Sequence, residues 1–326
     1  MVRYDILDLL AVNSEDFVSG ERISQQLHVT RAAVWKQIKV LKEEGFEIEG
    51  QTKNGYRLIR TPLSLNEWAL KRALTTTSLG NEIDLEDELL STNVRAKELS
   101  RKGGVHGQIV LAKRQSAGRG RLQRQWESPS GGLWMSVVLK PNLSLADASK
   151  LTLAASVAIV DALEEHFLLR IGIKWPNDLI YKGEKIAGIL GEVVGEWNAI
   201  QTLILGIGIN ANFPREQLDS ALNATTLLEI LGHEVDLNVL AAGILRHLEN
   251  QVKALENKAF EELRLNWTQR ALGLGENVRV LRGEQVFLGV FRGISVDGEL
   301  ILETEEGEKC FTAGEVQLRS CVGKYF

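Results

Sequence analysis

Apolar side chains recur at helical spacing through the first 45 residues and then alternate with polar ones. The apolar stripes predict three helices: Tyr4–Val12, Glu21–Leu27, and a longer one that begins after Thr30 and ends before Gly45. Thr30 is a residue type that caps helix N-termini, and glycine commonly ends helices. The alternation that follows, interrupted by Lys53-Asn54-Gly55, predicts a hairpin. Helices and hairpin in this order predict a winged helix-turn-helix domain.

The third helix has a basic surface in a chain whose total charge is negative. On charge alone, its cations would simply solvate the outer face of a small helical cap. The order of turn, helix and Asn-Gly wing favours DNA binding, because a short basic helix fits a major groove and its cations meet phosphates. The expected DNA contacts are Thr30, Arg31, Lys36, Lys39 and Lys53.

Strand-like apolar runs alternate with helical stretches between residues 83 and 270, which indicates an α+β or α/β domain on one large sheet. The predicted strands are Glu88–Ser91, Gly107–Ala112, Trp134–Leu139, Gly172–Trp175, Ile186–Val194 and Thr202–Ile209. The predicted helices are Asn93–Lys102, Ala146–Phe167 and Val239–Leu263. Later residues predict five short strands: Val278–Leu281, Val286–Ile294, Leu300–Glu303, Cys310–Ala313 and Val316–Arg319.

Two changes of pattern divide the chain. Arg60-Thr61-Pro62-Leu63 has the composition of a linker, and Ser64 with Glu67 forms the capping-box pattern that opens a helix over Leu65–Leu74. The helical pattern of the central region gives way to strands near residue 272. We therefore expect three domains, 1–62, 63–272 and 273–326, which agrees with a length of 326 residues.

Composition narrows the class of protein. With 44% hydrophobic and 25% charged residues, the chain is too apolar to be disordered. Its apolar runs are shorter than the roughly 20 residues that span a bilayer, and Asp5 and Asp8 stand where a signal peptide needs positive charge. Two cysteines, Cys310 and Cys321, provide no disulfide framework. We expect a cytoplasmic protein without a membrane partner.

A net charge of −5 argues against a protein that coats nucleic acid, but the charge is unevenly distributed. Residues 111–126 carry lysines and arginines and no acid. Within them Gly118 and Gly120 let the backbone approach a ligand closely, while Arg119, Arg121 and Arg124 are planar forks suited to phosphate or carboxylate. No lysine follows the glycines as in a Walker loop. A solvated basic loop is the ordinary alternative.

Four further segments carry polar residues or glycines at predicted strand ends: Ser91-Thr92-Asn93, Lys174–Leu179, Lys185–Leu190 and Gly206–Asn210. A hairpin between the second and third would place Lys185 beside Asp178. Taken singly, each segment has an ordinary explanation, namely a helix N-cap, a surface ion pair, or glycines at a bulge or a tight sheet contact.

Together with the loop at 115–126, these segments occur in the order and approximate spacing seen in biotin protein ligases. The chain resembles, essentially from end to end, the bifunctional bacterial type that doubles as the biotin operon repressor. The resemblance implies a winged helix-turn-helix, a class II synthetase-like catalytic domain with a mixed sheet, and a small SH3-like barrel. One departure is Gln123, where many members have glycine before the arginine matched by Arg124.

The resemblance also implies a two-step reaction. Biotin attacks the α-phosphate of MgATP to give biotinyl-5′-adenylate and pyrophosphate, and a lysine of a biotin carboxyl carrier domain then displaces AMP. The implied biotin site is Ser91, Thr92, Asn93, Gln115, Gly118, Arg119, Lys185, Gly188, Gly206 and Gly208. The implied ATP or adenylate site is Arg119, Arg121, Arg124, Trp126, Asn177, Lys185 and Asn210. The implied catalytic residues are Lys185, Arg121 and Asp178.

The implied partners are the carrier domain, operator DNA and a second copy of the chain, because one winged domain reads a half-site weakly and the adenylate would favour a dimer. Mg²⁺ would arrive with ATP, near Asp178, since no Cys/His cluster suggests a metal cage. Two other interpretations stay open: a biotin-sensing repressor with a spent active site, and a lipoate ligase or octanoyl transferase of related fold. Trp126 and Trp134 either wall the biotin pocket or belong to the core.

Overall fold

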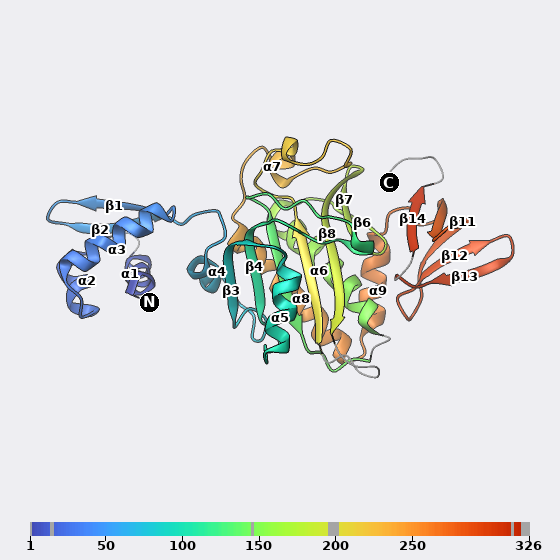
Figure 1. The fold of residues 1–326 in the computed structure, drawn as a ribbon, viewed down its shortest axis with the longest axis horizontal. Helices are drawn as coiled ribbons and strands as arrows, with labels where there is room; N and C mark the ends of the chain where they lie inside the picture. The colour runs from blue at the N-terminus through green and yellow to red at the C-terminus, as the bar shows by residue number, and fades with distance from the viewer. Residues whose placement is uncertain (1, 14–15, 145–146, 195–201, 314–315, 321–326) are drawn as a thin grey trace. The chain divides into compact units, whose positions relative to one another are not determined.

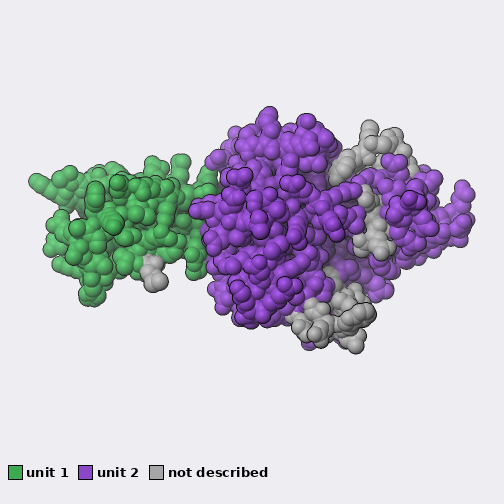
Figure 2. Space-filling view, viewed as in Figure 1, with its two compact units in different colours: residues 1–72 green, residues 73–326 purple. Residues whose placement is uncertain are grey.

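The computed structural model describes residues 2–13, 16–144, 147–194, 202–313 and 316–320. The chain divides into two compact units, residues 1–72 and 73–326 (Figure 2). No helix among the described residues is both long and apolar enough to cross a membrane.

The first unit contains the predicted helices and hairpin. Its elements are α1 (Val2–Val12), α2 (Gly20–Gln26), α3 (Arg31–Glu43), β1 (Glu47–Gln51), β2 (Gly55–Arg60) and α4 (Glu67–Ala73) (Figure 1). Thr30 caps α3 by accepting a hydrogen bond from the Ala33 amide, as its residue type predicts. Their apolar faces form one buried cluster that includes Leu7, Ile38 and Leu41.

Helix α4 is part of this first core. The ring of Trp68 meets that of Phe46 edge to face, with 5.8 Å between ring centres, and its Nε1 donates a hydrogen bond to Asp8 (2.9 Å). The packing of Trp68 therefore extends the compact unit beyond the linker at 60–63.

The second unit is built on a mixed seven-stranded sheet in the order β3-β4-β5-β9-β8-β7-β6, in which only β3 and β4 are paired in parallel. The strands are β3 (Ile83–Leu89), β4 (Ile109–Gln115), β5 (Leu133–Leu139), β6 (Gly172–Lys174), β7 (Asp178–Tyr181), β8 (Glu184–Val194) and β9 (Thr202–Ile209). The inner strands β5 and β9 are buried along almost their whole length, which explains their continuous apolar sequences.

The helices of this unit are α5 (Thr92–Arg101), α6 (Ala148–Phe167), α7 (Leu227–Leu231), α8 (Leu237–Glu256) and α9 (Phe260–Gln269). The single helix predicted over 239–263 is wrong. Lys258 adopts a left-handed conformation (φ 60°), and this ends α8 before α9 begins. The strand predicted over 88–91 is displaced as well, because β3 is an edge strand whose charged residues hide its alternation.

The C-terminal strands form a five-stranded antiparallel sheet in the order β13-β12-β11-β10-β14. They are β10 (Asn277–Arg282), β11 (Gln285–Ile294), β12 (Leu300–Thr304), β13 (Gly307–Phe311) and β14 (Val316–Ser320). Four of the five follow the predicted strands with small differences at their ends, whereas β13 begins three residues before the strand predicted at Cys310–Ala313 and ends at Phe311. Cys310 is an exposed free thiol, and Cys321 lies outside the described residues.

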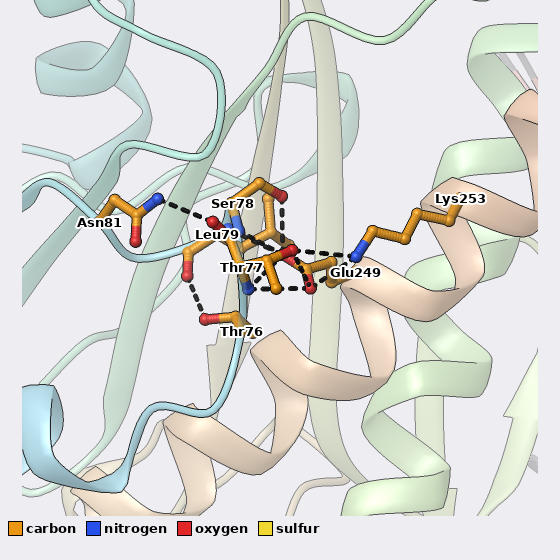
Figure 3. A network of polar contacts seen from close by, with 7 residues as sticks. All are labelled: Thr76, Thr77, Ser78, Leu79, Asn81, Glu249 and Lys253. Atoms are coloured by element: carbon orange, nitrogen blue, oxygen red, sulfur yellow. Dashed lines mark hydrogen bonds and ion pairs between the residues drawn. The ribbon is translucent and has the colours of Figure 1, made fainter.

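A carboxylate on α8 fastens the segment that leads into the central sheet (Figure 3). Glu249 is 6% exposed and accepts hydrogen bonds from the backbone amides of Thr77, Ser78 and Leu79. The Thr77 and Ser78 hydroxyls and the Lys253 ammonium complete its shell. Burial works against the charge, but these donors hold the pKa of Glu249 well below its ordinary value.

Replacing Glu249 with alanine is expected to lower the free energy of unfolding by about 3 kcal/mol, because several buried donors lose their acceptor. The ionised carboxylate stabilises the fold fully above pH 4.5, its ordinary pKa, and this contribution is lost as the pH falls toward the depressed native value. Urea denaturation at several pH values measures both effects. Glu261→Ala, which removes an exposed carboxylate paired with Arg264, is the control and should change stability little.

Candidate functional site

A cavity of about 350 Å³ opens in the second unit. Its walls come from the start of α5, the loop after β4, the β6–β7 turn, strands β8 and β9, and β14. Of the substrate-site residues that the resemblance implies, all but Gly118 line it: Ser91, Thr92, Asn93, Gln115, Arg119, Arg121, Arg124, Trp126, Asn177, Asp178, Lys185, Gly188, Gly206, Gly208 and Asn210. Segments far apart in the sequence therefore meet at one site.

Gly118 lies beside the cavity, where the loop folds back on itself. A Cβ at Gly118 would come within 2.3 Å of the Trp126 carbonyl oxygen and 2.6 Å of Ser128 Oγ. The Gly118 carbonyl accepts a hydrogen bond from the Trp126 amide. Glycine is thus required at position 118, because the loop segment at Gly118 passes close to the backbone of Trp126 and the side chain of Ser128.

The floor of the cavity is a connected group of polar side chains. Gln115 Oε1 accepts a hydrogen bond from the Thr92 amide (2.8 Å), and Gln115 Nε2 donates to Ser128 Oγ (2.7 Å). Ser136 Oγ lies 2.8 Å from Thr92 Oγ1 and 2.6 Å from Asn93 Oδ1. Ser128 and Ser136 were not singled out from the sequence, because only the pairing of strands brings them to the predicted residues.

Ser91 precedes α5 as its N-cap residue, yet its side chain makes no capping hydrogen bond. It is 3% exposed and lines the cavity. Helix capping therefore does not account for this hydroxyl, which leaves it suited to a ligand.

Glycines of β8 and β9 make one wall flat. A Cβ at Gly188 would lie 2.8 Å from the Trp126 ring, one at Gly208 would lie 2.7 Å from its Nε1, and one at Gly206 would lie 2.3 Å from Asn93 Oδ1. The Trp126 indole consequently lies directly on the strand backbones, and its buried Nε1 has no hydrogen-bond partner among the described residues. Trp134, by contrast, packs on Phe213 in the core and does not line the cavity.

A cation and a carboxylate face each other at the β7–β8 hairpin, as the spacing predicted. Lys185 Nζ lies 2.5 Å from Asp178 Oδ1, and it also lies 4.8 Å from the ring centre of Trp126. Both side chains of the pair are partly buried, at 22% and 16% exposed. The ammonium is therefore held between an acid and an aromatic face at the cavity wall.

The arginine loop reaches the C-terminal sheet. Arg121 donates hydrogen bonds to Asn177 Oδ1 (3.2 Å) and to the Ala313 carbonyl. Burial, with help from the nearby charge of Arg124, lowers the pKa of Arg121, while Asp178 acts in the opposite direction. Leu318 and Arg319 of β14 also line the cavity, so the C-terminal domain contributes to the site.

The departure at Gln123 has a backbone counterpart. Leu122 and Gln123 have φ of 55° and 59°, in the left-handed region that glycine adopts without strain. A side chain costs roughly 1–2 kcal/mol per residue there. Glycine at position 123 would therefore relax the loop, whereas this chain holds the turn under strain.

Two further polar side chains are deeply buried at the site. Asn210 donates to the Thr225 carbonyl (3.1 Å), whereas its Oδ1 has no partner among the described residues. Lys174 is 2% exposed, and no role was assigned to it from the sequence. Burial lowers the pKa of Lys174 to about 7, and the charges of Arg319, Lys185 and Arg124 act in the same direction while Asp178 opposes them.

No group of three or more histidine, cysteine, aspartate or glutamate residues in the described part of the chain could hold a metal ion. The carboxylates that line the cavity are Glu127 and Asp178. This set fits an ion that arrives on the phosphates of a nucleotide, with Asp178 near it, better than an ion caged by protein.

The first unit presents the residues expected to contact DNA. Arg31, Lys36 and Lys39 are exposed on α3, and Lys53 occupies the hairpin turn with φ of 74°. Sequence reasoning missed Trp35, which is 61% exposed on the same helix. The helical periodicity of α3 could have revealed Trp35, because Trp35 lies outside the buried stripe formed by Val34, Ile38 and Leu41.

Comparisons with known protein families give a match in each of the three predicted domains. Residues 89–210 match the biotin/lipoate A/B protein ligase family, residues 2–57 match a helix-turn-helix domain, and residues 273–319 match the biotin protein ligase C-terminal domain.

Similar proteins cover nearly the whole chain. The bifunctional ligase/repressor BirA of Bacillus subtilis is 37% identical over 97% of this chain and 98% of its own, and that of Escherichia coli is 30% identical over 95% of each. The structure of biotin protein ligase from Aquifex aeolicus in complex with biotin and ATP is 34% identical, with a TM-score of 0.64 over 74% of this chain and 99% of its own. The chain belongs to the family of bifunctional biotin protein ligases and repressors.

Proposed function

We propose that this protein is an ATP-dependent biotin protein ligase that also represses transcription of biotin synthesis genes in response to biotin. The observation that carries the proposal is the cavity itself, in which a polar floor, a glycine wall and a set of cations are joined. A similar solved structure holds both biotin and ATP.

The polar floor suits the ureido ring of biotin, because Thr92, Gln115 and Ser91 offer partners that a buried polar ring requires. The ring system and the valeryl chain lie against the wall formed by the Trp126 indole, which packs on Gly188 and Gly208. This places the carboxylate of biotin toward Lys185. Arg119, Arg121 and Arg124 bind the phosphates, and Trp126, Asn177 and Asn210 contact the nucleoside.

In the first step a carboxylate oxygen of biotin bonds to the α-phosphorus while the bond to pyrophosphate breaks. Lys185 stabilises the negative charge that gathers on the bridging oxygens. Mg²⁺ carried by ATP neutralises phosphate charge. In the second step an uncharged lysine amine of the carrier domain attacks the biotinyl carbonyl, and AMP leaves with the bonding electrons. Asp178 orients the amine and receives its proton.

Transfer to a carrier domain tests the enzymatic half. The protein, incubated with ATP, Mg²⁺, biotin and a biotin carboxyl carrier domain, should attach biotin to one lysine of that domain. Excess lipoate should not compete, because a dithiolane ring leaves the polar floor without partners. Preferential transfer of lipoate would instead assign the protein to the related lipoate ligases.

The lowered pKa of Lys174 leads us to expect that the protein takes up protons when ATP binds. A polyanion in the cavity favours the charged ammonium, so a lysine with a pKa of about 7 should take up a proton between pH 7 and 8. The apparent affinity for ATP should then fall as pH rises through this range. Calorimetry in buffers of different ionisation enthalpy measures the uptake, which Lys174→Met should reduce and the exposed-site control Lys182→Met should not. Equal uptake by both variants would contradict the assignment.

If the protein is a repressor, removing cations from α3 should change the salt dependence of DNA binding and leave the enzymatic reaction unaffected. Replacing Lys36 and Lys39 with glutamine removes two phosphate contacts, so the slope of log affinity against log salt should flatten by about 2. Binding to a random-sequence duplex, followed by fluorescence anisotropy, measures it. Lys71→Gln on α4, a helix that follows the helix-turn-helix match at residues 2–57, is the control, and adenylate formation should stay unchanged in all variants.

The DNA-binding form is a homodimer that the adenylate favours, because two half-sites need two winged domains. Sedimentation of the protein with and without biotinyl-adenylate tests this point. An unchanged monomer in both states would refute it.

A further inference from the structure

A chain of hydrogen bonds runs under the cavity floor and ends on a carboxylate outside the cavity. Glu192 on β8 accepts hydrogen bonds from Lys97 (2.5 Å) and from the side-chain amide of Asn93 (2.7 Å). Glu192 itself is not among the residues that line the cavity, whereas Asn93 is. The carboxylate can therefore act on a ligand only through its neighbours.

The orientation of the Asn93 amide follows from these contacts. A carboxylate only accepts hydrogen bonds, as does the Leu190 carbonyl, which lies 3.4 Å from the same nitrogen. Nδ2 must therefore face Glu192, and Oδ1 must face Ser136 Oγ at 2.6 Å. Gly206 makes room for this arrangement, since a Cβ there would collide with the Asn93 amide.

The orientation is passed on through Ser136, which has one hydroxyl proton and is fully buried. That proton is committed to Asn93 Oδ1. The Thr92 hydroxyl then has two acceptors in reach, Ser136 Oγ at 2.8 Å and Gln115 Oε1 at 3.1 Å. With either acceptor the Thr92 proton is used inside the protein, so Thr92 Oγ1 offers only lone pairs to the cavity.

We infer that Glu192 is a positioning residue that makes Thr92 a hydrogen-bond acceptor toward the substrate, and that it thereby selects a ring bearing an N–H group. The inference rests on the proposed function, in which the ureido ring of biotin supplies that N–H. A dithiolane or an alkyl chain offers no such donor.

The charge of Glu192 is essential to this arrangement. Burial opposes ionisation, but hydrogen bonds from Lys97 and Asn93 and the charges of Lys97 and Arg119 hold the pKa of Glu192 below its ordinary value. In Glu192→Gln the Lys97 ammonium would take the new carbonyl oxygen, and the new amide nitrogen would face Asn93. The Asn93 amide would then turn and Ser136 could donate to Thr92 Oγ1, while the Thr92 proton stays on Gln115 Oε1, so Thr92 would have one lone pair fewer to offer to the cavity.

The test compares Glu192→Gln with Glu165→Gln, which removes a carboxylate on α6 paired with Arg246 and His247 outside the cavity lining. For Glu192→Gln the KM for biotin should rise about 10-fold, the effect of one lost hydrogen bond, while kcat stays within twofold. For a biotin analogue methylated on its ureido nitrogens, the same substitution should raise the KM far less than it does for biotin. The control should match the parent protein.

Ser136→Ala interrupts the same series of hydrogen bonds between Glu192 and Thr92. This variant replaces Glu192→Gln as the test if Glu192→Gln does not fold. It should also raise the KM for biotin, and adding Glu192→Gln should cause little further rise, because both act through one chain. An unchanged KM in a folded Glu192→Gln protein, or effects that simply add, would overturn the inference. Absence of any biotin-dependent reaction in the parent protein would instead remove the proposed function.

Discussion

Replacing Lys185 with methionine is expected to slow biotinyl-adenylate formation by about 100- to 1000-fold, the usual loss when one preorganised charge partner of a transition state is removed. Lys185 is held by Asp178 at 2.5 Å and rests on the Trp126 ring at the cavity wall. It therefore meets the developing charge without reorganisation. Methionine keeps most of the side-chain length and an apolar contact with Trp126, so the loss reports mainly on charge.

Rapid-quench measurement of a single turnover separates this effect from transfer. The control is Lys182→Met on the same hairpin, whose ammonium lies over the Tyr181 ring and which does not line the cavity. The control should form adenylate at the parent rate. If Lys185→Met does so too while remaining folded, Lys185 does not act in the first step.

Replacing Gly208 with valine is expected to lower kcat/KM for biotin at least about 100-fold, because displacing groups by an ångström at a reacting centre has effects of that size. Even a single Cβ at Gly208 would lie 2.7 Å from Trp126 Nε1. The larger side chain must push the indole away from β9 or occupy the space along the strand, and either change spoils the wall against which the substrates lie.

Gly50→Val is the matched control, since Gly50 also lies in a strand and a Cβ there would meet only the Tyr56 ring, at 3.6 Å. It should leave biotin activation unchanged. Thermal unfolding of both variants separates loss of the site from loss of the fold. Parent-like kinetics in a folded Gly208→Val protein would contradict the role given to the glycine wall.

Periodicity was sufficient where an element buries one clear face. Helix α3 and strand β10 follow their predicted patterns because core and solvent alternate regularly along them. Periodicity failed where the apolar pattern was weak, and where a change of backbone conformation ended an element although the apolar pattern continued. Charged residues obscure the edge strand β3, and the left-handed Lys258 divides a stretch whose apolar spacing is continuous.

The site shows the same division. Motif spacing was enough to predict that Lys185 and Asp178 meet, because a short hairpin dictates that contact. Ser136 and Glu192 could not be predicted, since their importance depends on which strand pairs with which, and β5 joins β9 only through long-range pairing. Lys174 was visible as a lysine at a strand end, but its burial was not.

If one cavity joins biotin to AMP, the protein by itself should convert biotin and ATP to biotinyl-adenylate. The most direct measurement mixes the folded protein with ATP labelled at the α-phosphate and follows the label with and without biotin. A tightly bound biotinyl-adenylate should form in amounts stoichiometric with the chain, accompanied by pyrophosphate, and neither product should form without biotin. No biotin-dependent adenylate, or equal adenylate formation with lipoate, would contradict it.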